Sequence, residues 1–129
     1  MSAQDSMAGA VNALIQLRNH KVSEATETAK QIRVLKAAWD KTNVHIDTCR
    51  AHLSRLRGES KVVLLGEYKR ILEMEQVNEK LRGNYKVRID EMVSVGRSLQ
   101  EEIRHLDRDI DSANRAYETF TTNKVVPFR

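Results

Sequence analysis

The chain is poor in the residues that interrupt regular structure. It has a single proline, Pro127, close to the C-terminus, and only five glycines among 129 residues. A β-sandwich or an α/β domain of this length needs more turn-forming residues. Aromatic residues make up only 5% of the chain, which is little for a bulky globular core. These shortages predict an all-α protein whose long helices bury a narrow apolar seam.

Cysteine and long apolar runs are also scarce. The one cysteine, Cys49, excludes an internal disulfide and fits a reducing compartment. No apolar run approaches the roughly 18 residues of a membrane span. The first five residues, Met-Ser-Ala-Gln-Asp, lack the basic and apolar segments of a secretory signal. We therefore expect a cytoplasmic protein without a membrane span.

The charge is distributed unevenly. Residues 1–58 contain nine Lys/Arg and five Asp/Glu, whereas residues 59–129 contain thirteen of each. The basic residues form no dense cluster, so the pattern does not favour nucleic-acid binding. A basic helical nucleic-acid-binding protein is kept as the rival hypothesis from another class, with steeply salt-dependent binding as its signature.

A helical period runs from residue 10 to Arg57, after a small and polar stretch at 1–9 that we expect to form a flexible tail. Apolar residues recur at alternating steps of three and four, as in the seam of a coiled coil. The predicted seam positions are Val22, Ala25, Ala29, Ile32, Leu35, Trp39, Thr42, Ile46, Cys49, Leu53 and Leu56. The step from Ile32 to Leu35 is three where four is due, which predicts a local overwinding.

A turn is predicted at 58–60. Arg55 and Arg57 favour a helix end, and Gly58 suits a left-handed residue after it. Ser60 can then cap the next helix, 61–122. Pro127 excludes a helix from the tail, 123–129.

The second helix carries its own seam. Its predicted positions are Leu64, Tyr68, Ile71, Met74, Leu81, Tyr85, Ile89, Met92, Val95, Leu99, Ile103, Leu106, Ile110, Ala113, Tyr117 and Phe120. Steps of four between Leu81 and Ile103 predict a local unwinding of the supercoil. A second turn at Gly83-Asn84 would give a three-helix arrangement, but the seam continues across it and favours one helix.

Two tethered helices with one apolar stripe each should fold back as a long antiparallel hairpin. Folding about 58–60 makes the numbers of facing residues sum to about 118, which places Leu53 opposite Leu64 and Leu35 near Leu81. We expect residues 1–129 to form a single elongated helical domain.

The sequence contains no recognisable catalytic or phosphate-binding motif. His45, Cys49 and His52 share roughly one helix face and are of the types that bind zinc. Cys49 also fills a seam position, and no fourth ligand is evident, so we interpret the three as structural. We expect neither enzymatic activity nor a small-molecule substrate, cofactor or metal.

The candidate binding site lies near the end of the second helix. In the antiparallel hairpin the second helix extends past the N-terminal end of the first predicted helix. The residues of this extension keep three-four spacing: Leu106, Ile110, Ala113, Tyr117 and Phe120. An apolar stripe without an intramolecular cover marks an interaction site. We expect it to bind a helix of another protein, with the two aromatic residues as anchors. The alternatives are that the N-terminal residues Met7 to Leu14 cover part of the stripe, or that the chain dimerises there.

A helical hairpin whose C-terminal helix is the longer is similar to the export-stalk proteins of flagellar and type III secretion systems. It is also similar to small coiled-coil subunits of eukaryotic ciliary and trafficking complexes. No motif separates these families. The sequence therefore predicts a non-enzymatic coiled-coil adaptor or structural subunit of a larger complex, with a secretion stalk or export chaperone as the alternative.

Overall fold

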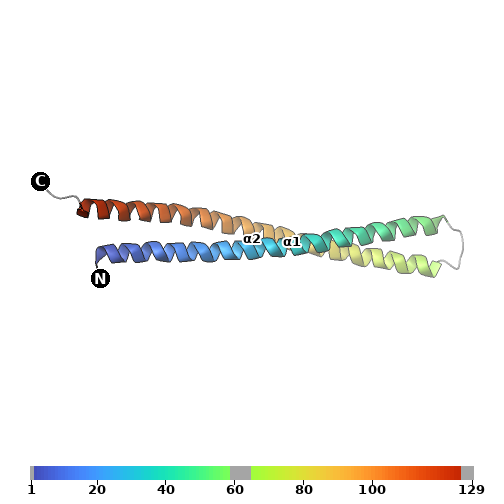
Figure 1. Ribbon diagram of the computed structural model, residues 1–129. Helices are drawn as coiled ribbons and strands as arrows, with labels where there is room; N and C mark the ends of the chain where they lie inside the picture. The colour runs from blue at the N-terminus through green and yellow to red at the C-terminus, as the bar shows by residue number, and fades with distance from the viewer. Residues whose placement is uncertain (1, 59–64, 126–129) are drawn as a thin grey trace. The chain divides into compact units, whose positions relative to one another are not determined.

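The computed structural model describes residues 2–58 and 65–125, which form two long helices. Helix α1 spans Ala3–Arg57 and helix α2 spans Leu65–Val125 (Figure 1). Their contacts divide into a first unit, made of Met1–Ala29 with Val95–Arg129, and a second unit, Lys30–Ser94. In each unit a segment of α1 packs against an antiparallel segment of α2. The predicted all-α helical hairpin is confirmed.

Helix α1 begins earlier than predicted. The stretch 1–9 was expected to be a flexible tail, but α1 starts at Ala3. Ser2 caps it, because its Oγ accepts a hydrogen bond from the backbone N–H of Asp5 at 3.1 Å. The backbone nitrogen of Ser2 in turn lies 3.4 Å from Asp5 Oδ2. This reciprocal pair satisfies two free backbone donors of the first turn and extends the helix to the N-terminus.

The predicted end of α1 at Arg57 is confirmed, but the conformation of Gly58 is not the predicted one. No glycine in the described ranges has a positive φ. The N–H of Gly58 instead donates to the carbonyl of Arg55 at 3.2 Å, which closes the last turn with an i to i−3 bond. Arg55 and Arg57 lie in this last turn, where the helix dipole favours cations. Glu59 and Ser60 of the predicted turn lie outside the described residues.

Helix α2 is continuous through Gly83 and Asn84. This confirms the prediction of one helix rather than a turn that would give three. Gly83 is exposed, and no atom lies within 4 Å of the position that a Cβ would take. The glycine therefore weakens the local helix preference without interrupting packing. The helix ends at Val125 rather than at 122. Among the described residues, neither helix has the length and apolarity needed to cross a bilayer.

The seam of α1 is more regular than predicted. Thr28, not Ala29, is the buried residue, since Thr28 is 8% exposed and Ala29 is exposed. With this change, steps of three and four alternate without interruption, and the predicted overwinding at Ile32 is wrong. The seam positions, none of which is exposed, are Gln4, Met7, Val11, Leu14, Arg18, Lys21, Ala25, Thr28, Ile32, Leu35, Trp39, Thr42, Ile46, Cys49, Leu53 and Leu56.

The seam of α2 is also an uninterrupted heptad pattern. The predicted seam residues Met74, Leu81 and Val95 are 51%, 40% and 48% exposed. Polar residues and a glycine take their places, so the predicted local unwinding is wrong. The seam positions, again none exposed, are Tyr68, Ile71, Glu75, Asn78, Arg82, Tyr85, Ile89, Met92, Gly96, Leu99, Ile103, Leu106, Ile110, Ala113, Tyr117 and Phe120.

The contacts between the helices establish the register. A Cβ at Gly96 would lie 3.8 Å from Thr28 Cγ2, and Arg82 Nη1 donates to Asn43 Oδ1 at 3.2 Å. The numbers of facing residues therefore sum to about 124 rather than to about 118, which pairs every seam residue of α1 with one of α2. The predicted register is wrong because Gly96 and Arg82, which were not expected in the seam, face Thr28 and Asn43.

The best-buried apolar cluster lies in the second unit. Cys49, Leu53, Leu56 and Ile71 are each at most 7% exposed and pack together. Burial of a leucine-sized side chain contributes about 1.5–3 kcal/mol, so this cluster is a main source of stability for the second unit. Thr42 is buried nearby, where its hydroxyl donates to the carbonyl of Ala38 at 2.8 Å. This bond lets a polar side chain occupy the seam without an unsatisfied donor.

Cysteine cross-linking should distinguish the two registers. In a Cys49→Ala background, we expect Leu35→Cys with Ile89→Cys to form an intramolecular disulfide, because the two positions face each other across the seam. Leu35→Cys with Leu81→Cys is the matched control from the discarded register. Mass spectrometry after mild oxidation measures both yields. Equal yields, or a higher yield for the control, would contradict the register.

Candidate functional site

The predicted binding stripe lies in the first unit and is covered differently from the expectation. Leu106, Ile110, Ala113, Tyr117 and Phe120 are all partly buried. Because α1 begins at Ala3, it runs opposite the stripe, and Gln4 Nε2 donates to Tyr117 Oη at 3.3 Å. We expected the N-terminal end of the first helix to stop short of the stripe, and this expectation is wrong. The role of these residues in partner binding stays a prediction.

Ion pairs hold the two helices together across the first unit. Arg18 Nε lies 2.9 Å from Asp107 Oδ1, and Lys21 Nζ lies 3.2 Å from Glu102 Oε2. The hydrogen bond to Glu102 raises the pKa of Lys21 above its ordinary value. Two basic seam residues are thus matched by carboxylates of α2. This pairing allows cations to occupy the seam and neutralises them locally.

An apolar row of α1 side chains lies beside the seam in the first unit. The row consists of the residues that directly follow Met7, Leu14, Lys21 and Thr28, the heptad e positions. We call it the e-side stripe: Ala8, Ile15, Val22 and Ala29. Ile15 is 37% exposed, Ala29 is exposed, and the other two are partly buried. The pairing with α2 thus leaves the stripe partly uncovered.

The second unit has a different e side. The equivalent residues of α1 are Lys36, Asn43, Arg50 and Arg57. Arg50 Nη2 donates to Glu79 Oε1 at 2.7 Å, and this bond lowers the pKa of Glu79. Arg57 Nε donates to Tyr68 Oη at 2.9 Å. Charged e positions that pair across the seam are typical of a two-stranded coiled coil. The e side of α1 therefore changes from apolar to polar between the units.

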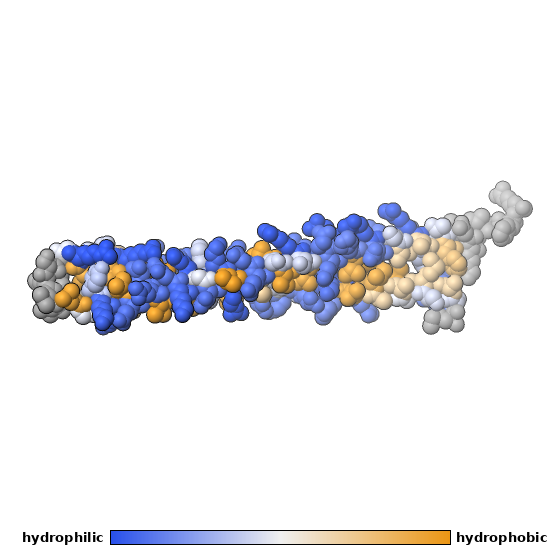
Figure 2. All heavy atoms as spheres, turned by 180° about the vertical axis from the view of Figure 1, so that it is seen from behind, coloured by the Kyte–Doolittle hydropathy of each residue, from blue (hydrophilic) through white to orange (hydrophobic). Residues whose placement is uncertain are grey.

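The space-filling view shows how hydrophobic residues are distributed over one face of each unit. Hydrophobic residues gather along one face of the first unit, where few hydrophilic side chains separate them (Figure 2). On the e-side stripe Ile15 is 37% exposed, whereas Leu17, 46% exposed, lies two residues further along α1 and therefore on another side of the helix. Contiguous apolar surface of this kind is the usual mark of an interaction site.

The three residues considered for metal binding lie on different surfaces. Cys49 is buried in the seam, whereas His45 is exposed at its edge. His52 Nε2 lies 3.5 Å from Glu67 Oε1, which is close enough for an ion pair with a protonated imidazole. This nitrogen is buried and has no hydrogen-bond partner. Within residues 2–58 and 65–125, no group of three His, Cys, Asp or Glu side chains is arranged to hold a metal ion.

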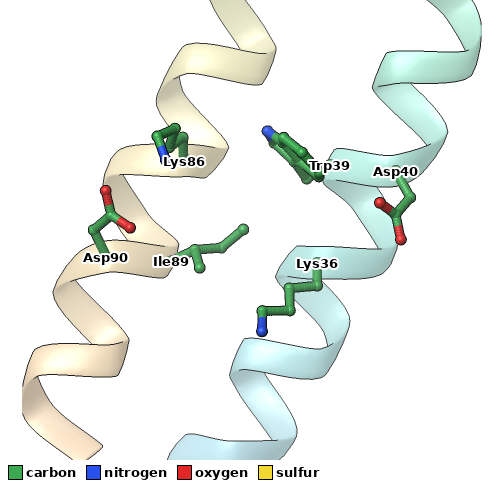
Figure 3. Close-up of a pocket in the computed structure, with 6 residues that line it drawn as sticks. All are labelled: Lys36, Trp39, Asp40, Lys86, Ile89 and Asp90. Carbon is green, nitrogen blue, oxygen red and sulfur yellow. The ribbon is translucent and has the colours of Figure 1, made fainter.

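Trp39 lines a shallow groove in the second unit. The side chain extends from α1 toward α2, and Ile89 extends from α2 toward α1 (Figure 3). The groove has a volume of about 210 Å³, and its other lining residues are Lys36, Asp40, Lys86 and Asp90. The indole Nε1 of Trp39 is buried without a hydrogen-bond partner. Trp39 thus occupies the seam as predicted, and it packs there loosely.

Removal of the Cys49 thiol tests its structural interpretation. We expect Cys49→Ala to lower the free energy of unfolding by about 1 kcal/mol, because a small buried group is lost. His45→Ala, at an exposed site, should leave thermal unfolding nearly unchanged. Both melts should be the same with and without a chelator. Stoichiometric zinc in the purified protein, lost on Cys49→Ala, would contradict this interpretation.

Comparisons with known proteins assign no family to the chain. No family model matches it, and neither a curated protein nor a solved structure is significantly similar to it. Its candidate site therefore stands on the chemistry of the described residues alone.

Proposed function

We propose that the chain is a non-enzymatic coiled-coil subunit or adaptor that binds a helix of another protein along its first unit. The observation that carries the proposal is the e-side stripe, Ala8, Ile15, Val22 and Ala29, beside an intact seam. We further propose that it acts in the cytoplasm, where its free Cys49 would remain reduced.

The reason is the width of the apolar face. Two helices that pair only with each other need apolar residues at positions a and d, which form a narrow stripe. A helix that packs within a larger bundle also needs apolar residues at e or g. In the first unit α1 has this wider pattern, and in the second unit it does not. A third helix docked beside the first unit would cover the e-side stripe.

The predicted stripe on α2 contributes to the same surface. Ile110 and Tyr117 occupy the seam positions of α2 that border the e side of the pair. Because both are only partly buried, a docked helix could contact them together with Ile15. We therefore keep Leu106, Ile110, Ala113, Tyr117 and Phe120 as contributors to partner binding, with α1 supplying the rest of the surface.

The electrostatics favour a protein partner over nucleic acid. Arg18 and Lys21 in the first unit and Arg50 in the second unit are paired with carboxylates. Cations that are already neutralised contribute little to phosphate binding, which depends on the release of counterions by free Lys and Arg. The pair thus neutralises three of the nine Lys and Arg residues of α1.

Substitution of Ile15 tests the proposal with little disturbance of the seam. Ile15→Glu places a charge in the proposed contact, and glutamate is well tolerated in helices. Since burial of an isoleucine contributes about 1.5–3 kcal/mol, we expect the affinity for the partner helix to fall by roughly 10- to 100-fold. Affinity purification identifies the partner, and titration of the purified pair measures the affinity.

Val44→Glu is the matched control, because Val44 is 61% exposed on α1 in the second unit. It should leave binding unchanged, and both variants should keep the helix content of the original chain. If Ile15→Glu binds every partner as tightly as the control does, the e-side stripe is not the binding surface.

A further inference from the structure

A second exposed apolar stripe lies on α2 in the second unit. Met74, Val77 and Leu81 are 51%, 66% and 40% exposed. They are spaced three and four residues apart, so they share one side of the helix. Each directly precedes a seam residue but is itself exposed, so the stripe lies outside the contact between α1 and α2. Nothing in the coiled-coil pair requires apolar residues here.

We propose that this stripe binds the same stripe of a second copy of the chain, with the two α2 helices antiparallel and a two-fold axis at Val77. In this arrangement Val77 faces Val77 of the second copy, and Met74 faces Leu81 on either side. A symmetric contact of this kind needs a surface that is complementary to itself. The charges around the stripe meet this condition.

Opposite charges face each other on both sides of the proposed axis. Glu73 of one copy faces Lys80 of the other, and the symmetry repeats this pair. Within the described residues, neither Glu73 nor Lys80 is engaged in an ion pair. About two turns further out, Glu67 faces Arg88. The flanking charges therefore favour a second copy of this chain as the occupant.

The same charges oppose the neighbouring registers. A shift of one heptad in one direction places Glu73 opposite Glu73 of the second copy. A shift in the other direction places Lys80 opposite Lys80. Like charges at facing positions are destabilising, so only the register centred on Val77 combines apolar contact with charge complementarity.

Shape supports the register as well. Val87 is 56% exposed and faces Gly66 of the second copy in this arrangement. The space beside Gly66 is open, since no atom lies within 4 Å of the position that a Cβ would take. A larger side chain is therefore matched by a smaller one at the ends of the contact. The stripe lies in the second unit, so this proposal is independent of the partner site in the first unit.

Oxidative cross-linking tests the two-fold axis. In a Cys49→Ala background, Val77→Cys should give a disulfide-linked dimer, because the two thiols meet at the axis. Val87→Cys is the matched control: it is similarly exposed on the same helix, yet it faces Gly66 rather than itself. Equal dimer yields for the two variants, or none for Val77→Cys, would overturn the proposal.

Charge reversal tests, without introduced cysteines, whether a second copy of the chain binds the stripe. Sedimentation equilibrium should show a concentration-dependent dimer for the full chain. Glu73→Lys and Lys80→Glu should each weaken it by on the order of tenfold at low salt, because each variant creates two repulsive contacts. The double variant restores opposite charges and should restore the dimer. A chain that is monomeric at all concentrations, or single variants that dimerise unchanged, would contradict the proposal.

Discussion

The pairing of one uninterrupted heptad seam with another determines where every other side chain lies. Thr28 faces Gly96, and Asn43 accepts a hydrogen bond from Arg82. With these two contacts in place, the helical repeat assigns each remaining residue to the seam, to its edges or to the outer surface. The seam tolerates polar residues because each finds a local solution. Thr28 and Thr42 donate to carbonyls one turn back, and Arg18 reaches Asp107. The apolar layers between them supply the stability.

The two units use this common seam differently. In the second unit the edge of α1 is polar, and Arg50 and Arg57 connect the helices, so α1 offers no apolar edge to a further helix there. In the first unit the corresponding edge is apolar, and one face gathers hydrophobic side chains (Figure 2). A change of edge chemistry along one continuous helix separates a segment of α1 with a polar edge from a segment whose apolar edge suits a further helix. The proposed partner site follows from this difference.

Much of the fold could be predicted from the sequence, because long helices have strong local signals. The end of α1 at Arg57, the continuity of α2 through Gly83 and the seam from Leu35 to Leu56 were all predicted. The start at Ala3 was missed, although Ser2 and Asp5 form a capping pair that the sequence displays. That omission made the stripe on α2 look uncovered.

The register was missed for a different reason. Hydrophobicity alone favoured Met74, Leu81 and Val95 as seam residues, whereas Glu75, Arg82 and Gly96 occupy the seam. Strict heptad spacing, extended through polar positions, would have found them. The e-side stripe was missed because its importance depends on which residues are already in the seam.

A nuclear Overhauser measurement on threonine methyl groups tests the shared seam most directly. With methyl-labelled threonine, the account predicts a cross-peak between the Thr28 methyl and the Hα protons of Gly96, whose backbone the methyl closely approaches. The exposed Thr26, on the same turn of α1, should show no contact with α2. Cross-peaks from Thr28 to residues of α2 one heptad away, with none to Gly96, would contradict the account.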